Sequence, residues 1–242
     1  MQLDERKNKI LKAIIENYIA TGEPVGSRTL SKIGGLDLSP ATFRNEMADL
    51  EDMGLLEHTH ISSGRLPTDK GYRYYVENIM PHPIVPTGEK ERLKTLIEEK
   101  TGQMHDLVRE IADLYSRLIN YTVFSLPPEM SEQIVMRGIT NFLNFPEYSN
   151  IAKAKRVLDF LDDGTALKNA LAPLTTSEQK MDIIIGDENI AEEIKDCSIV
   201  VSKYKSKDGR IGTIGVIGPK RMDYSRAIAT LDLITKELED SG

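Results

Sequence analysis

Side chains that could carry catalysis or bind metal are few in this chain of 242 residues, which has four histidines and one cysteine. His58 and His60 stand two residues apart in a strand-like segment, so both would lie on one face and could bind a metal ion. No third ligand is evident beside them, and ordinary surface histidines explain the pair more simply. Cys197 falls in an apolar run that is typical of a buried thiol. We therefore expect no enzymatic activity, no metal and no cofactor.

Three glycines near the end of the chain, Gly212, Gly215 and Gly218, recur at a spacing of three. A phosphate-binding loop would need a strand, then a loop with the glycines, then a helix N-terminus. Here two of the glycines lie inside an apolar strand pattern. Close packing against the backbone, or a bulge, is therefore the better interpretation.

The strongest candidate for a binding site is the segment LSPATFRNEMADLEDMGLLE, residues 38–57. Ser39 is a suitable N-cap, a proline occupies the first helical position, and a glycine follows the last turn. On a helical wheel the apolar residues share one face. The N-terminal part of the opposite face and its shoulders carry small or hydrogen-bonding residues: Ala41, Thr42, Arg44, Asn45 and Ala48.

Such a face suits the major groove of DNA, because small residues admit the helix while Asn, Thr and Arg can read base edges. The free N–H groups at the helix start also favour phosphate. Two observations count against this interpretation. The chain has a net charge of −7, and the same helix carries Glu46, Asp49 and Asp52, which would repel phosphates if they faced them. DNA binding must therefore depend on a local arrangement of cations.

The elements around this helix follow the order of a winged helix-turn-helix. An amphipathic helix ends near Gly22, and a short helix follows with Ser27 as its expected cap and Leu30 and Ile33 as buried anchors. A strand, a turn and a returning strand come after the third helix, and Thr68 caps a fourth helix to about residue 80. In this order the second helix lies on the phosphates and the third enters the groove. The expected contacts outside the third helix are Ser27, Arg28, Ser63, Gly64, Arg65 and Lys70.

The proline-rich segment 81–88 is the best domain boundary. We expect a winged-helix domain at 1–82, a linker and connecting helix at 83–103, and a mixed α/β domain at 104–242, which together make an α+β fold. In the second domain the pattern predicts helices at 102–121, 151–163, 165–173 and 224–239, a strand in QIVMRGI, a strand at 181–186, and a hairpin around KSKDG.

The expected helix at 102–121 carries an apolar seam with a heptad-like repeat. The seam could be the core of its own domain or a dimer interface, and the pattern alone leaves both open. The candidate dimerisation residues are Leu107, Ile111, Leu114 and Leu118.

Four stretches, ATGEPVGSRTLSK, the segment from LDLSPATFRNEM to VENIM, KDCSIVVSKY and GTIGVIGPKRMDYSRAI, resemble the bacterial heat-inducible transcription repressor family, HrcA. The resemblance implies a homodimeric winged-helix repressor that binds an inverted-repeat DNA operator upstream of chaperone genes. It also implies a second domain similar to GAF domains, and the chaperonin GroEL as a partner. By position, Ser39, Thr42, Arg44 and Asn45 match the family's recognition helix, and Ser63, Gly64 and Arg65 match its wing turn.

The chain departs from the usual family pattern near residues 127–132, where SLPPE runs directly into MSEQIVMRGITNF. The part that the family has here includes some of the GAF-like sheet and an inserted segment linked with dimerisation. We therefore expect a reduced sheet, and the seam at 104–118 is the candidate substitute for the dimer interface.

Two other functions stay open on the sequence. The GAF-like domain could act as a small-molecule sensor, with the glycine-bearing strand lining its pocket. Alternatively, a shortened second domain could leave an interaction protein that no longer dimerises. No apolar run approaches the ~18 residues of a membrane span, and the first 25 residues lack a signal-peptide core, so we expect a cytoplasmic protein with no membrane partner.

Overall fold

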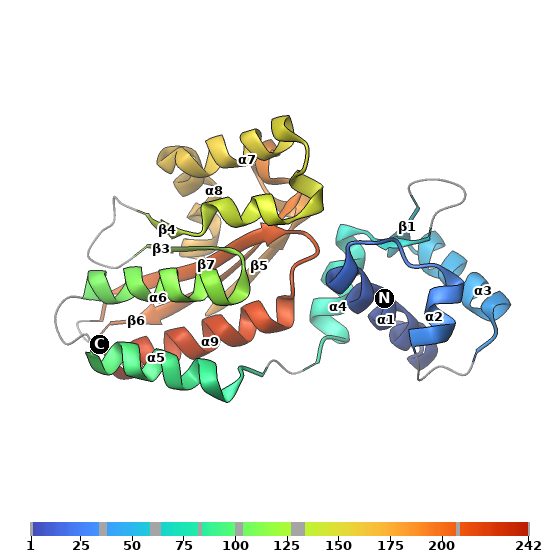
Figure 1. Ribbon diagram of the computed structural model, residues 1–242, viewed down its shortest axis with the longest axis horizontal. Helices are drawn as coiled ribbons and strands as arrows, with labels where there is room; N and C mark the ends of the chain where they lie inside the picture. Colours follow the sequence, from blue (N-terminus) through green and yellow to red (C-terminus); the bar gives the residue numbers. More distant parts are fainter. Residues whose placement is uncertain are drawn as a thin grey trace. The chain divides into compact units, whose positions relative to one another are not determined.

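The computed structural model of the chain describes residues 2–33, 38–58, 64–81, 84–99, 104–126, 134–206 and 209–241. The chain divides into two compact units, Met1–His82 and Pro83–Gly242 (Figure 1). The described residues form α-helices and antiparallel sheets, in agreement with the expected α+β class.

The first unit begins with helix α1 (Glu5–Thr21). Asp4 caps its start by accepting a hydrogen bond from the backbone N–H of Lys7 at 2.8 Å, and Gly22 ends it in the left-handed conformation with φ 72°. The predicted apolar face is buried through Ile10, Leu11, Ile14 and Ile15. The remaining elements of this unit are α2 (Ser27–Ile33), α3 (Pro40–Asp52), β1 (Leu56–Glu57), β2 (Leu66–Pro67) and α4 (Asp69–Asn78).

Helix α2 differs from the prediction in two details. Ser27 is its first helical residue, and the carbonyl of Gly26 accepts the hydrogen bonds from the N–H groups of Thr29 and Leu30, so the predicted Ser27 cap was wrong. Of the two expected anchors, Leu30 is buried but Ile33 is 41% exposed.

Strands β1 and β2 pair in antiparallel fashion, with Leu56 opposite Pro67. The segment before β2 also pairs with the connection between α1 and α2, where Val25 and Arg65 exchange two backbone hydrogen bonds of 2.8 and 2.9 Å. Gly64 lies directly beside this bridge, and a Cβ there would come 2.5 Å from the carbonyl carbon of Val25. Glycine is therefore required at this position by the close approach of the two backbones.

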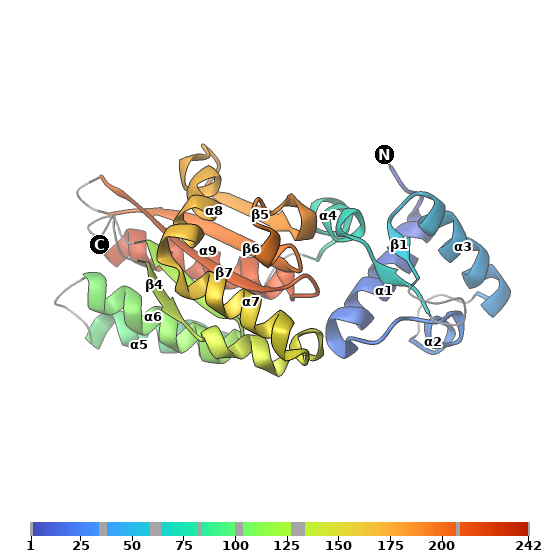
Figure 2. The same ribbon diagram turned by 90° about the horizontal axis from the view of Figure 1, so that it is seen from above.

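The second unit is built on a five-stranded antiparallel sheet in the order β4-β3-β7-β6-β5 (Figure 2). The hairpin predicted around KSKDG is present as β6 and β7, but β3 was missed because its short apolar run directly follows a helix. The strands are β3 (Thr122–Leu126), β4 (Val135–Arg137), β5 (Met181–Ile185), β6 (Cys197–Lys205) and β7 (Ile211–Pro219).

Helices cover both faces of this sheet (Figures 1 and 2). Helices α6 and α9 pack on one face, with α5 outside them, and α7 and α8 lie over the other. Alternate side chains of β6 point to opposite faces of the sheet. Ile199 packs in the core under α7 and α8, whereas Ser198 and Ser202 form hydrogen bonds with side chains of α9. The bounds are α5 (Thr87–Glu99), α6 (Met104–Ile119), α7 (Ile151–Asp162), α8 (Gly164–Thr176) and α9 (Tyr224–Ser241), with 3-10 helices at Ile139–Asn144, Pro146–Tyr148, Gly186–Glu188 and Glu192–Ile194.

Helix α5, which falls in the expected linker region 83–103, packs as part of the second unit. Leu93 is fully buried there, and Glu89 forms an ion pair of 2.7 Å with Arg226 of α9. The same guanidinium donates to the carbonyl of Leu118 at 2.9 Å, so one arginine ties α5, α6 and α9 together.

The glycines of β7 make room for aromatic rings. A Cβ on Gly215 would lie 2.5 Å from Cζ of Phe124, and tyrosine rings face Gly212 and Gly218 in the same way. The interpretation of these glycines as close-packing positions is confirmed. Because aromatic side chains fill the space above them, they do not line a ligand pocket.

Candidate nucleic-acid interface

Helix α3 is held by its cap and by its apolar face. The hydroxyl of Ser39 accepts a hydrogen bond from the N–H of Thr42 at 3.1 Å, as the sequence predicts. Phe43, Met47 and Leu50 are buried in the first unit. Burial of this face fixes the rotation of the helix and so decides which side chains point outward.

The outward face of α3 carries the side chains expected from the sequence. Ala41, Arg44, Asn45 and Ala48 are exposed. Within the described residues, the Arg44 and Asn45 side chains have no hydrogen-bond or ion-pair partner, so both are available to a ligand. Thr42 is half-buried, and its hydroxyl lies 3.0 Å from that of Ser39.

Two of the acidic residues of α3 are paired with cations of α1. Lys7 Nζ lies 2.8 Å from Glu46 Oε2 and 3.0 Å from Asp49 Oδ2, and Arg6 Nη1 lies 3.4 Å from Glu46 Oε1. These hydrogen bonds hold the pKa of Lys7 above its ordinary value. Sequence reasoning missed this cluster, because no local pattern relates residues that lie about forty positions apart.

A third acidic residue of α3, Glu51, is paired with groups from the β1–β2 region. Its Oε2 accepts from Arg65 Nε at 2.7 Å, and its Oε1 contacts His58 Nδ1. Arg65, expected as a cation at the turn, therefore has a carboxylate partner and is only partly exposed. Its role in phosphate binding stays a prediction.

The other expected contact residues are spread over the unit. Arg28 is exposed at the start of α2, next to the half-buried Ser27. Lys70 donates to the carbonyl of Met53 at 2.7 Å and so caps the C-terminal end of α3. Ser63 lies outside the described residues.

The apolar seam of α6 faces mainly into its own unit. Leu107 and Ile111 are buried, so these two residues are not available to a second copy and the dimer prediction was wrong for them. Leu114 and Leu118 are only partly buried. For these two the dimer contact stays a prediction.

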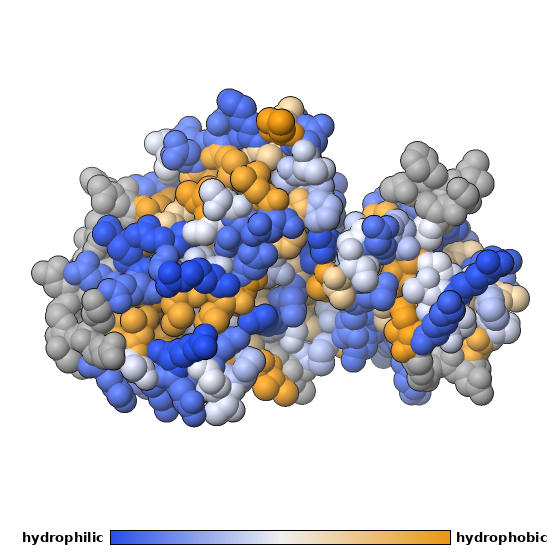
Figure 3. All heavy atoms as spheres, viewed as in Figure 1, coloured by the Kyte–Doolittle hydropathy of each residue, from blue (hydrophilic) through white to orange (hydrophobic). Residues whose placement is uncertain are grey.

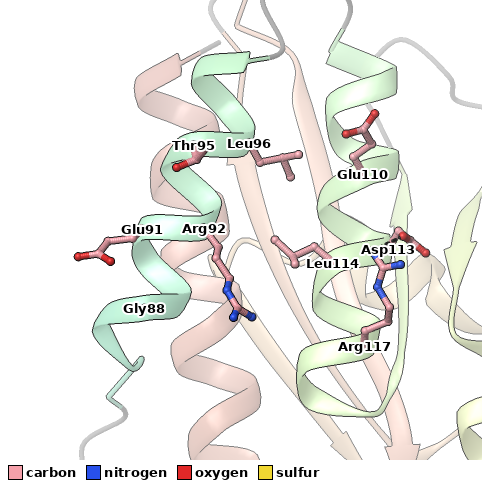
Figure 4. Close-up of a pocket in the computed structure, with 9 residues that line it drawn as sticks. All are labelled: Gly88, Glu91, Arg92, Thr95, Leu96, Glu110, Asp113, Leu114 and Arg117. Atoms are coloured by element: carbon pink, nitrogen blue, oxygen red, sulfur yellow. Dashed lines mark ion pairs between the residues drawn. The ribbon is translucent and has the colours of Figure 1, made fainter.

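Leu114 lines a groove of about 670 Å³ between α5 and α6. Leu96 of α5 and Leu114 of α6 point toward each other across it (Figure 4). Charged residues of both signs surround them, including Glu91 and Arg92 on α5 and the ion pair of Arg117 with Asp113 at 2.6 Å on α6. Figure 3 shows apolar side chains gathered between polar rows on the face that carries these helices.

Cys197 is buried in β6, where burial raises the pKa of its thiol to about 12. A thiol in this state is unreactive at neutral pH, in agreement with the sequence interpretation.

Among the described residues, no group of three His, Cys, Asp or Glu side chains could hold a metal ion. His60 of the predicted pair lies outside those residues. In the same part of the chain, no helix combines the length and the apolar character that crossing a membrane requires.

Comparison with known proteins identifies the family. The family model described as "HrcA protein C terminal domain" matches residues 87–228. Proteins named heat-inducible transcription repressor HrcA from Clostridium botulinum and Clostridium tetani are each 32% identical to the chain, and the matches cover 99% of it and 98% and 95% of those proteins. The chain belongs to the HrcA family.

The alignment with the Clostridium botulinum HrcA protein spans 340 positions against the 242 residues of this chain. The chain therefore lacks roughly 100 positions that this relative has. In the structure, the junction noted near residues 127–132 falls between β3 and β4, which pair directly through Val123 opposite Arg137. Strands from before and after the junction therefore belong to the same five-stranded sheet.

A solved structure has a fold similar to that of this chain. It is the structure named "Crystal structure of a hypothetical protein at 2.2 A resolution", which matches with a TM-score of 0.74 and 17% sequence identity. The match covers 99% of this chain and 98% of that one. At this identity the likeness concerns the fold alone.

Proposed function

We propose that this HrcA-family chain is a sequence-specific DNA-binding repressor of heat-shock genes. The first unit would act as a winged helix-turn-helix, with α3 in the major groove and the β1–β2 region beside it. The observation that carries the proposal is the outward face of α3, where exposed Arg44 and Asn45 have no partner among the described residues and stand between two small residues, Ala41 and Ala48. Such a role places the protein in the cytoplasm with the chromosome.

Fluorescence anisotropy tests this function directly. The full chain is titrated onto a labelled inverted-repeat duplex from a chaperone-gene promoter, with a scrambled duplex of equal length as control, at low and at physiological salt. We expect a preference of ~10³ or more that survives physiological salt. If the chain bound both duplexes equally, and physiological salt abolished this binding, sequence-specific repression would be contradicted.

The chaperonin GroEL is a proposed partner that rests on family membership. Repeating the titration with chaperonin present would show whether the repressor needs it to reach a binding-competent state. Under this proposal, chaperonin raises the fraction of chain that binds the operator. An unchanged active fraction in chain refolded with and without GroEL would argue against it.

Arg28 is the cation that we expect to contact phosphate most directly. It is exposed at the start of α2 and has no side-chain partner in the part of the chain that the structure describes. Arg28→Ala should weaken binding to operator and scrambled DNA alike and lower the slope of log K against log salt by about 1. The control is Lys9→Ala, since Lys9 is an exposed cation paired with Glu5 on α1. Loss confined to the operator would assign Arg28 to base reading instead.

We propose that the protein acts as a homodimer, so that two copies of α3 meet two half-sites. The groove between α5 and α6 is the proposed contact surface, because it exposes Leu114 and carries charges of both signs, which a two-fold contact can pair with each other. Leu118 lies one turn further along α6 and is also partly exposed.

The double variant Leu114→Glu, Leu118→Glu should convert the dimer to a monomer in light scattering. Buried carboxylates without partners would oppose association of the two copies. The matched control is Ile211→Glu, which changes an apolar residue that is 65% exposed elsewhere in the same unit. If the double variant kept the mass of a dimer, the groove between α5 and α6 would not be the dimer interface.

The second unit, with its five-stranded sheet between helices, supports the proposal of a GAF-like domain. A small-molecule sensor is less well supported, because aromatic rings fill the space above the β7 glycines.

A further inference from the structure

The acidic residues of α3 are an electrostatic obstacle to the proposed function. Asp49 stands one turn after Asn45 on the same side of the helix, and its side chain is 54% exposed. A helix that enters the major groove passes between two rows of phosphates, so an unpaired carboxylate there would be repelled. Glu46 adds a second carboxylate toward α1.

Lys7 pairs with both carboxylates at once, and its single positive charge offsets one of their two negative charges. It comes from the first turns of α1, and its Nζ lies 2.8 Å from Glu46 and 3.0 Å from Asp49. Only 14% of the lysine side chain is exposed, which leaves it little surface for a phosphate contact of its own. Asp4 lies farther from the same ammonium, at 3.8 Å.

We propose that Lys7 is a positioning residue for DNA binding that screens the carboxylates of α3 from the phosphates. This inference rests on the proposed function of α3 and extends it to a residue outside the helix-turn-helix. The lysine acts through Glu46 and Asp49, not by touching DNA. Its effect is therefore the same for every DNA sequence, and it should be strongest at low salt, where repulsion is least screened.

The test compares four variants of the full chain by anisotropy on operator and scrambled duplexes. Lys7→Met should weaken both complexes about five- to tenfold at low salt, and the defect should shrink as salt rises. Lys7→Arg, which keeps the charge, should bind like the unmodified chain. The matched control is Lys9→Met on the same helix, because Lys9 pairs with Glu5 at 2.6 Å and not with α3; it should change binding less than about twofold.

The decisive variant combines Lys7→Met with Glu46→Gln and Asp49→Asn. If Lys7 only screens the carboxylates, their removal makes the lysine dispensable, and binding returns to the original strength or above. A folded triple variant that still binds weakly would overturn the proposal, and so would a Lys7→Met defect no larger than that of Lys9→Met.

The triple variant also keeps the test valid if Lys7→Met alone fails to fold, since it leaves no buried carboxylate without a partner. Circular dichroism melting of each variant identifies such a case. Failure of the proposed function itself looks different, because the unmodified chain would then show no preference for the operator.

Discussion

Gly71→Ala is expected to destabilise the first unit strongly and so weaken operator binding, while the second unit stays folded. Gly71 is buried in the first turn of α4, where a Cβ would overlap the carbonyl oxygen of Leu55 and lie 3.1 Å from its carbonyl carbon. This carbonyl cannot move aside easily, because it accepts a hydrogen bond from the N–H of Thr68 at 3.1 Å and Leu55 itself donates to Leu50 at 2.9 Å. We expect a loss of about 3 kcal/mol or more in the free energy of unfolding.

Hydrogen exchange measured by mass spectrometry separates the two units in the full chain. Peptides from α1 and α3 should lose protection in Gly71→Ala, whereas peptides from β6 and β7 should keep it. For a domain of this size the melting temperature of the first unit should fall by more than about 10 °C. Gly88→Ala is the matched control, because a Cβ at Gly88 in α5 would meet nothing within 4 Å. Unchanged protection in Gly71→Ala would contradict the steric argument.

Local pattern predicted those elements whose signals lie within a single stretch of sequence. Helix α3 is an example, since its cap at Ser39 and its buried Phe43, Met47 and Leu50 are separated by only a few residues. The β6–β7 hairpin is another, because its turn residues stand between two apolar runs. Strand β3 was missed, since five residues shortly after a helix carry too little pattern to distinguish a strand from a continuation of the helix.

Contacts between distant segments could not be predicted in the same way. The Lys7 cluster and the pair of Arg65 with Glu51 join residues that only the packed unit brings together. Burial of Leu107 and Ile111 was equally open, because an apolar heptad seam has the same appearance whether it faces its own core or a second copy. For the candidate site, the sequence thus indicates which side chains α3 presents, but not which of the charges around them already have an ion-pair partner.

Asn45→Ala is expected to lower the sequence preference and to leave the general affinity for DNA almost unchanged. Asn45 is exposed on the outward face of α3, and its side chain has no partner within the described residues of the unit. An asparagine in the major groove can form two hydrogen bonds with one adenine, and each such pair is worth ~1–3 kcal/mol against the wrong base. Operator binding should therefore weaken by about 5- to 150-fold at unchanged salt dependence.

The control for this variant is Ala48→Ser, a small change on the same exposed face one turn further along α3. It should preserve the operator preference, because serine stays small and removes no existing contact. The scrambled duplex should bind Asn45→Ala and the unmodified chain within about twofold of each other, since phosphate contacts carry no sequence information. Equal losses on both duplexes would assign Asn45 to the DNA backbone. The base-reading role would then be assigned to Arg44, which also has no side-chain partner among the described residues.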